Sequence, residues 1–270
     1  MTSRLGATLL KMKNSLWLPC LLILLAGCQS EKPPYLAIGG ETMGTYYKVT
    51  YQDSLHRDFK HPVDSLLKVI NDEISTYIPT STVSQFNQAD SIFELGLNLA
   101  EFDRCIISET CGNLKNKHFF ANLQAAKWAW EVTNHAFDPT VMPLVNFWGF
   151  GYTPQKAVEK LDSAKVDSLL QFVGFQKLEL LDRGGNAVLK KPAKGVQLDF
   201  GGTGQGYAID EIAVFLEKRG IKNYLVDIGG ECRARGVNAE GKNWRIGINT
   251  PKPEAQVTDF EQMVELENRS

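Results

Sequence analysis

One stretch of the chain decides how its neighbours can be arranged: Val196-Gln197-Leu198-Asp199-Phe200-Gly201-Gly202-Thr203-Gly204-Gln205-Gly206-Tyr207-Ala208-Ile209-Asp210. Apolar and polar side chains alternate over residues 196–200, which predicts a strand, and glycines between Gly202 and Gly206 end that pattern. A helix is predicted next, because one of its faces would carry Ile209, Ile212, Ala213 and Leu216. The free N–H groups and the dipole of its first turn favour a phosphorylated ligand there, although a tight connection that binds nothing is the alternative.

The first 28 residues have the pattern of an export signal rather than of a folded segment. Two lysines precede the apolar run from Leu16 to Ala26, and Leu25-Ala26-Gly27-Cys28 has the form of a lipobox. We therefore expect residues 1–28 to be a lipoprotein signal peptide and Cys28 to carry acyl chains such as palmitate. The protein would then be exported and anchored by lipid to a bacterial membrane, on its periplasmic or outer face. The alternative is an N-terminal anchor helix, for which the apolar run is short.

The rest of the chain, about 240 residues, is long enough for one large domain or two modest ones. We expect residues 29–34 to be a tether and residues 35–270 to form the folded domain. Its strands outnumber its βαβ units, which favours an α+β fold with mixed or antiparallel sheets and packed helices. The formal net charge is -2 and no basic tract occurs, so a nucleic-acid partner is not expected.

Periodicity predicts the main elements of that domain. Helices are predicted over about 62–74, 119–133 and 162–173, with a short helix inside 81–90. Strands are predicted over about 46–51, 178–181, 187–190, 223–228, 232–237 and 244–248. Residues 93–116 have no clear period, and no element is assigned to them.

Cysteines and histidines show no spacing typical of a zinc site. After loss of the signal, Cys105, Cys111 and Cys232 accompany Cys28. Cys105 and Cys111 can close a small disulfide loop outside the cell, and three free thiols are the open alternative. The four histidines are His56, His61, His118 and His135, of which the last stands at a turn position and is expected to be structural.

Seven separated segments carry distinctive patterns: Thr42–Tyr47, Ser75–Tyr77, Ser84–Asn87, Ala136–Val141, Pro143–Gly151, Leu198–Asp210 and Val226–Glu231. In this order they resemble the motifs of the ApbE family of FAD:protein FMN transferases. The resemblance covers the chain from Thr42 to about Ile248. The lipobox is consistent with it, since many members of that family are exported bacterial lipoproteins.

The resemblance implies an ApbE-like, T-fold-like α+β architecture and a transferase that uses FAD as its substrate together with Mg²⁺. Such an enzyme splits the FAD pyrophosphate and attaches FMN by a phosphoester to a threonine or serine of an acceptor protein. The typical acceptor is a subunit of a membrane redox complex, so protein flavinylation is the implied activity.

The resemblance also implies which residues contact FAD: Met43, Tyr77, Ala136, Phe137, Asp138, Asp199 and Gln205. The backbone carbonyl of Gly202 would help to hold magnesium, which a carbonyl does regardless of side chain. Gln205 stands where the family usually has lysine or glutamate, so it can hydrogen-bond FAD but supplies no charge. The structural alternatives are a buried core methionine for Met43, an ordinary half-buried tyrosine for Tyr77 and the start of a turn for Asp138. Trp148 and Phe150 can pack near the site, although aromatic residues in such a loop are more often core residues.

A catalytic histidine and further magnesium ligands are implied several tens of residues after residues 244–248, in S-H-x-I-D-P-like and D-A-x-x-T-like segments. The sequence given ends at Ser270, before either segment. No catalytic residue is therefore assigned, and the C-terminal part of the fold is expected to be missing. We expect this 270-residue form to bind FAD weakly or not at all and to transfer no FMN.

Three other functions stay open. The first is an exported lipoprotein that binds FAD without transferring it, and another is an inert scaffold. The third is a Rossmann-type oxidoreductase, because Asp227 follows the glycines by about 25 residues, where a ribose-binding acid lies in that fold. The glycine spacing disfavours it, since the run is GxGxG rather than GxGxxG.

Overall fold

The computed structural model describes residues 33–108, 114–152, 162–252 and 259–269, together with residues 254 and 256. The expected signal peptide, the lipidation at Cys28 and most of the expected tether lie outside the described residues. Among the residues that the structure describes, no helix has the length and apolar character needed to cross a bilayer.

The largest sheet is antiparallel and has four strands in the order β1-β2-β6-β7. These are β1 (Tyr35–Thr42), β2 (Thr45–Gln52), β6 (Tyr224–Ile228) and β7 (Glu231–Arg235). The two central strands alternate inward and outward side chains, and they bury Tyr47, Val49, Tyr51, Tyr224, Val226 and Ile228. Because Tyr47 pairs with Ile228, the β1–β2 and β6–β7 turns lie at the same end of the sheet.

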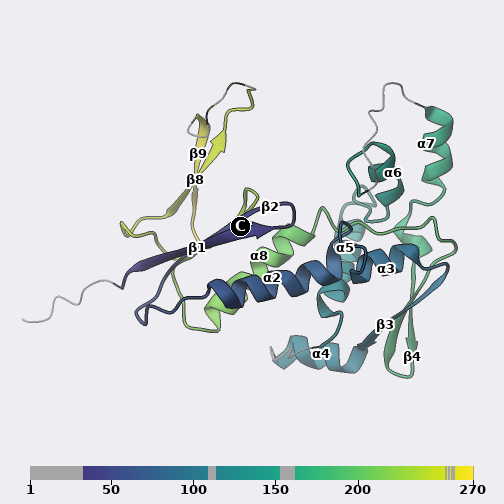
Figure 1. Cartoon of the computed structure of the whole chain (residues 1–270), viewed down its shortest axis with the longest axis horizontal. Coiled ribbons are helices and arrows are strands. Elements are labelled where there is room, and N and C mark those ends of the chain that lie inside the picture. The colour runs from purple at the N-terminus through teal and green to yellow at the C-terminus, as the bar shows by residue number, and fades with distance from the viewer. Residues whose placement is uncertain are drawn as a thin grey trace, which may run out of the picture.

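Two helices cover the buried face of this sheet. They are α2 (Lys60–Ile74) and α8 (Gly204–Glu217), which run side by side next to β1 and β2 in Figure 1. Each has an apolar stripe at helical spacing, made of Val63, Leu67, Ile70 and Ile74 in α2 and of Ala208, Ile209, Ile212, Ala213 and Leu216 in α8. Burial of these stripes against the sheet is the main stabilising contribution in this half of the molecule.

The other half is built on a three-stranded antiparallel sheet of order β3-β5-β4, at the opposite end of α2 in Figure 1. Its strands are β3 (Ile92–Asn98), β4 (Glu179–Arg183) and β5 (Asn186–Lys190). The helices here are α3 (Thr82–Gln88), α4 (Leu99–Ser108), α5 (Lys117–Val132), α6 (Met142–Phe147), α7 (Ser163–Leu170) and the 3₁₀ turn η1 (Phe175–Lys177). A two-stranded arm, β8 (Trp244–Asn249) with β9 (Phe260–Leu266), projects from the first half. All described strand pairs are antiparallel, and the predicted α+β class is confirmed.

Most predicted elements form within a few residues of their expected bounds. The region 93–116, left unassigned from sequence, contains most of β3, the whole of α4 and Asn116, the N-cap residue of α5. Its strand signal is hidden because Gly96 adopts a positive φ of 60° and the register of β3 shifts between Glu94 and Asn98.

The strand predicted over residues 196–200 is a correction. Only Gln197 makes a bridge, an isolated parallel one to Val141. The backbone hydrogen bonds of this segment go elsewhere: Asn87 bonds both backbone groups of Leu198 through its side chain, and Asp199 N donates to the carbonyl of Pro139. The alternation of apolar and polar residues in this segment thus reflects which side chains are buried, and the segment does not pair with neighbouring strands in a sheet.

Cysteine pairing goes against the alternative of three free thiols. Cys105 takes part in a disulfide, whereas Cys232 is free. Cys111, the partner that its spacing predicts, lies outside the described residues.

Candidate functional site at the start of helix α8

The first turn of α8 is not capped by its own sequence. The N-cap residue Thr203 makes no side-chain cap bond, and its hydroxyl donates instead to Asn122 Oδ1 at 3.2 Å. The first turn also contains no acidic residue. The N–H groups of Thr203 and Gly204 donate to the carbonyl of Phe200 at 3.0 and 2.7 Å, whereas no described residue accepts from those of Gln205 and Gly206. These two N–H groups can bind an external acceptor, and the positive end of the helix dipole adds to the attraction for an anion.

The glycines bring two other segments against this turn. A Cβ on Gly202 would lie 2.9 Å from Cε2 of Phe137, and a Cβ on Gly204 would lie 3.0 Å from Cδ1 of Ile74. Such distances are too short for a side chain to be added without a shift of the neighbour. The loop of Phe137 and the end of α2 can pack this closely because the run has no side chains at these positions.

Two hairpin turns meet the other side of the helix start. Gly229 has a φ of 59°, and a Cβ there would lie 2.8 Å from Thr45 Cγ2 and 3.1 Å from Gln205 Nε2. Its backbone N–H donates to the carbonyl of Tyr46 at 3.0 Å. Met43 lies in the β1–β2 turn with a φ of 51° and packs, half-buried, against the core. The structure therefore brings Met43 and Gln205 to the same end of the sheet as the glycine run.

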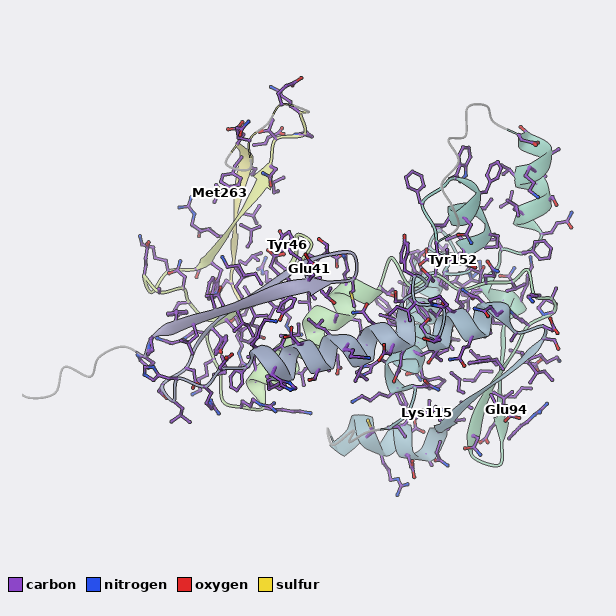
Figure 2. All side chains as sticks on the ribbon, viewed as in Figure 1. Glu41, Tyr46, Glu94, Lys115, Tyr152 and Met263 are labelled. Carbon is purple, nitrogen blue, oxygen red and sulfur yellow. The ribbon has the colours of Figure 1, made fainter. Side chains whose placement is uncertain are left out.

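Tyr46 marks the outer face of that hairpin in Figure 2, where it pairs with Glu41 across the β1–β2 ladder. The charge of Asp227 raises the pKa of Tyr46, and its phenol donates to Asp227 Oδ2 at 3.5 Å. The second oxygen of Asp227 accepts the backbone N–H of Gly230 at 3.0 Å. Asp227 thus stabilises its own turn.

The Rossmann alternative does not hold. That fold places a glycine turn between two parallel strands. Here the segment before the glycines is no strand, and β6, which ends in Asp227, pairs antiparallel with both β2 and β7.

Asp199 lies directly before the glycine run. Its Oδ1 accepts the backbone N–H of Gly201 at 2.8 Å, which is the one hydrogen bond to this carboxylate from the described residues. Burial raises the pKa of Asp199, and the bond from Gly201 partly opposes the rise. A poorly hydrated carboxylate with spare acceptor capacity beside the start of α8 is suited to bind a donor group of a ligand.

The loop before Pro139 is held by its own side chains. Asp138 Oδ1 accepts the N–H and the hydroxyl of Thr140 at 2.8 and 2.5 Å, and Oδ2 accepts the N–H of Phe175 at 2.9 Å. Asp138 therefore has the turn-forming role that its sequence position predicts. The flavin contacts of Ala136, Phe137 and Asp138 stay predictions, of which Phe137 is the one seen against the glycine run.

His135 has the expected structural role. It and Asn134 both adopt positive φ values, 67° and 49°, which non-glycine residues seldom adopt. The imidazole of His135 stacks on Trp130 with ring centroids 3.7 Å apart and an interplanar angle of 13°. This stack holds the strained turn that leads into the loop of Phe137.

The structural alternative for Tyr77, an ordinary half-buried side chain, is wrong, because this side chain is 68% exposed. Its hydroxyl donates to the carbonyl of Phe150 at 3.0 Å, which joins the end of α2 to the loop after α6. The expectation that Trp148 and Phe150 are core residues is wrong, because their exposed fractions are 40% and 77%. These side chains are available to a ligand or partner.

The metal ligand expected from sequence in this region is the backbone oxygen of Gly202. No described residue makes a hydrogen bond to the Gly202 carbonyl, and Gly202 is exposed, so this oxygen can serve as a ligand. Oxygen is the donor that Mg²⁺ prefers. Within the described ranges no group of three or more His, Cys, Asp and Glu side chains is arranged to hold a metal ion.

Sequence reasoning missed the buried polar residues that support this site. His118, in α5, shares a 2.7 Å hydrogen bond with the hydroxyl of Tyr207 in α8, and its backbone N–H donates to Glu73 of α2 at 2.7 Å. Asn87 and Lys191 hold the segment before the glycines. Asn87 and Tyr207 fall in segments that resemble family motifs, and nothing local in the sequence distinguishes His118, Glu73 and Lys191.

Comparison with known proteins relates this arrangement to one family. The model of the ApbE family matches residues 43–270. FAD:protein FMN transferases of Haemophilus influenzae and Vibrio cholerae are each 34% identical to the chain, and the matches cover 84% and 87% of it but 62% and 65% of those relatives. The chain thus spans less than two thirds of the length of these curated relatives.

Solved structures agree. The flavin transferase ApbE from Vibrio cholerae superposes with a TM-score of 0.67 at 28% identity, covering 87% of this chain and 69% of that one. The apo form of the Pseudomonas stutzeri flavinyl transferase ApbE gives a TM-score of 0.67 at 27% identity, with the same coverage of 87% and 69%. The fold of the described residues is therefore that of these flavin transferases.

Proposed function

Because the chain belongs to the ApbE family, we propose that the full-length protein is an FAD:protein FMN transferase. The observation that carries the proposal is the uncapped start of α8 among three segments of the family motifs. A site for FAD must bind two phosphates and a flavin ring. The helix start would bind the phosphates, and Met43, Tyr77 and Phe137 are proposed to bind the flavin ring.

The proposed reaction is a phosphoryl transfer. The hydroxyl oxygen of an acceptor threonine or serine bonds to the flavin-side phosphorus, the pyrophosphate P–O bond breaks, and AMP leaves. The acceptor proton passes to a base that we do not assign among residues 1–270. Asp199 and Gln205 would orient FAD by hydrogen bonds from their side chains, and the backbone N–H groups of Gln205 and Gly206 at the start of α8 would stabilise negative charge on the phosphates.

Magnesium is part of the proposal through Gly202, whose free carbonyl would be one of its ligands. A bound Mg²⁺ would neutralise charge on the pyrophosphate. The acceptor is proposed to be a protein subunit of a membrane redox complex, on the strength of the family alone.

The test is a transfer assay with the purified full-length protein, FAD, Mg²⁺ and an acceptor domain. Covalent flavin on the acceptor, seen by in-gel fluorescence, is the expected result, and it should disappear when EDTA is added. Bound FAD with no labelled acceptor would favour the alternative of an FAD-binding lipoprotein without transfer activity. The 270-residue chain, assayed in parallel, tests the expectation from sequence that it transfers no FMN.

Export and lipid anchoring are proposed as well, supported by the apolar run that ends in Leu25-Ala26-Gly27-Cys28. Cys28→Ala is expected to abolish incorporation of labelled palmitate, because the thiol is the site of acylation, and to move the protein out of the membrane fraction. Cys20→Ala, inside the expected signal, is the matched control and should keep both. Unchanged labelling of Cys28→Ala would contradict the proposal.

A further inference from the structure

The segment 196–200, which leads into the glycine run, is held by side chains in place of neighbouring strands. Asn87 of α3 is buried, and its amide makes both bonds that a partner strand would make with Leu198. The N–H of Leu198 donates to Asn87 Oδ1 at 2.7 Å, and Asn87 Nδ2 donates to the carbonyl of Leu198 at 2.9 Å. One side chain thus fixes the backbone position of the residue that precedes Asp199.

Lys191 also holds this segment, through hydrogen bonds from its ammonium group. Its side chain is 1% exposed, and the ammonium donates to the carbonyls of Val196 and Phe86 at 2.9 Å each and to that of Asn87 at 3.3 Å. Three carbonyls use all three ammonium protons. Two of these carbonyls end α3, where a cation is favoured by the helix dipole, and Nζ also lies 4.5 Å from the centre of the Phe86 ring.

These attachments connect the glycine run to the rest of the candidate site. At its other end, α3 is joined to the residue after α2, because the hydroxyl of Ser81 donates to the carbonyl of Ser75 at 2.6 Å. Tyr77 follows two residues later. Asp199 itself is tied to Pro139 through its backbone N–H. Asn87 and Lys191 therefore join residues 196–198 to α3, and the bonds of Ser81 and of the Asp199 backbone extend this connection to the segments of Tyr77 and Pro139.

We propose that Asn87 and Lys191 are positioning residues that hold residues 196–200 in register with α3, so that Asp199 and the glycine run present a preformed FAD site. The inference rests on the proposed function for its ligand. A site that is held by remote side chains loses affinity when they are removed, because the segment must then be ordered at the moment of binding.

The charge of Lys191 adds a pH dependence. Burial and, to a smaller extent, the charge of Lys194 lower its pKa to about 8, and Asp90 is the acidic group that opposes them. Since the folded pKa lies below the ordinary value of 10.5, charging Lys191 opposes folding at neutral pH, and this unfavourable contribution disappears as pH rises from about 8 to 10.5. Loss of the proton removes one of three donors from the carbonyls, so the hold on the segment weakens while global stability does not.

The experiment compares Lys191→Met with Lys190→Met in the full-length protein. Lys190 is the adjacent residue and is exposed, paired with Glu179 on the surface. At pH 7.5, Lys191→Met is expected to speed amide hydrogen exchange in residues 196–206 and to raise the Kd for FAD, each about tenfold. Lys190→Met should change neither. Unchanged exchange, or faster exchange with an unchanged Kd, would overturn the inference.

Two further measurements keep the test decisive. The wild-type Kd for FAD should rise several-fold between pH 7.5 and 9.5, and Lys191→Arg, which stays charged, should lose that rise. Asn87→Asp, which keeps the acceptor and loses the donor to Leu198, should give a smaller increase in Kd and serves if Lys191→Met does not fold. If the wild-type protein binds no FAD, the proposed function fails, whereas the exchange measurement still decides whether these residues hold the segment.

Discussion

Asp199→Ala is expected to lower FMN transfer at least about 100-fold, with a folded protein. The carboxylate is half-buried beside the start of α8, burial raises its pKa, and the described residues give it one hydrogen bond, from Gly201. Its other acceptor positions are therefore open to FAD. Removal of a half-buried group that orients a ligand leaves the ligand's own polar group unpaired in the complex, which costs more than loss of a surface contact.

The charge and the hydrogen bond of Asp199 can be separated. Asp199→Asn keeps the acceptor for Gly201 and most of the shape but removes the charge, so transfer is expected to fall about tenfold. Asp103→Ala, at an exposed position of α4, is the matched control and should transfer FMN at the wild-type rate. Single-turnover rates at saturating FAD, together with Kd for FAD, measure both effects. Transfer by Asp199→Ala within about threefold of wild type would remove this residue from the site.

His118 is expected to make the protein unstable in mild acid. Its side chain is 1% exposed, and burial lowers its pKa to about 3, with a smaller contribution from the neighbouring charge of Lys117. The folded pKa lies below the ordinary value of 6.5, so the stability that the neutral ring contributes is complete above pH 6.5 and is lost as pH falls toward 3. The loss at pH 5 relative to pH 7 is about 2 kcal/mol.

The measurement is the free energy of unfolding by urea at pH 5 and pH 7. In His118→Gln the difference between the two values should shrink by about 2 kcal/mol, because no imidazole is left to be protonated on unfolding. His61→Gln, at an exposed position, should leave the difference unchanged. Burial raises the pKa values of Glu73 and Glu211, whose contributions have the opposite sign, so only the change between variants isolates His118. Equal pH dependence in wild type and His118→Gln would contradict the prediction.

The amphipathic helices could be predicted from sequence because their signal is local. In α2 and α8 the apolar residues recur at helical spacing. Helix α2 begins and ends within two residues of its predicted bounds, and α8 buries the four residues predicted for its apolar face, Ile209, Ile212, Ala213 and Leu216. The glycine run was equally local, since only residues without side chains allow Phe137 and Ile74 to approach so closely.

Predictions from sequence were wrong where the residues that contact each other are far apart in the chain. Residues 196–200 alternate like a strand, yet their hydrogen-bond partners are Asn87, Lys191 and Pro139, which no local pattern identifies. Phe150 resembles a core aromatic in sequence and is 77% exposed. The residue type indicates whether a side chain favours burial, and tertiary packing decides whether it is in fact buried.

The sequence by itself determined the fold class, the helix that follows the glycines, and the family to which the motifs belong. Each of these depends on the spacing of residues within continuous segments of the chain, and that spacing can be read from the sequence without knowing any distant contact. Only the tertiary structure decided that the start of α8 lacks a side-chain cap, that Asp199 is desolvated, and that Asn87 and Lys191 hold the approach to it. Burial and hydrogen-bond partnership are properties of pairs of segments, and they exist only once the chain has folded.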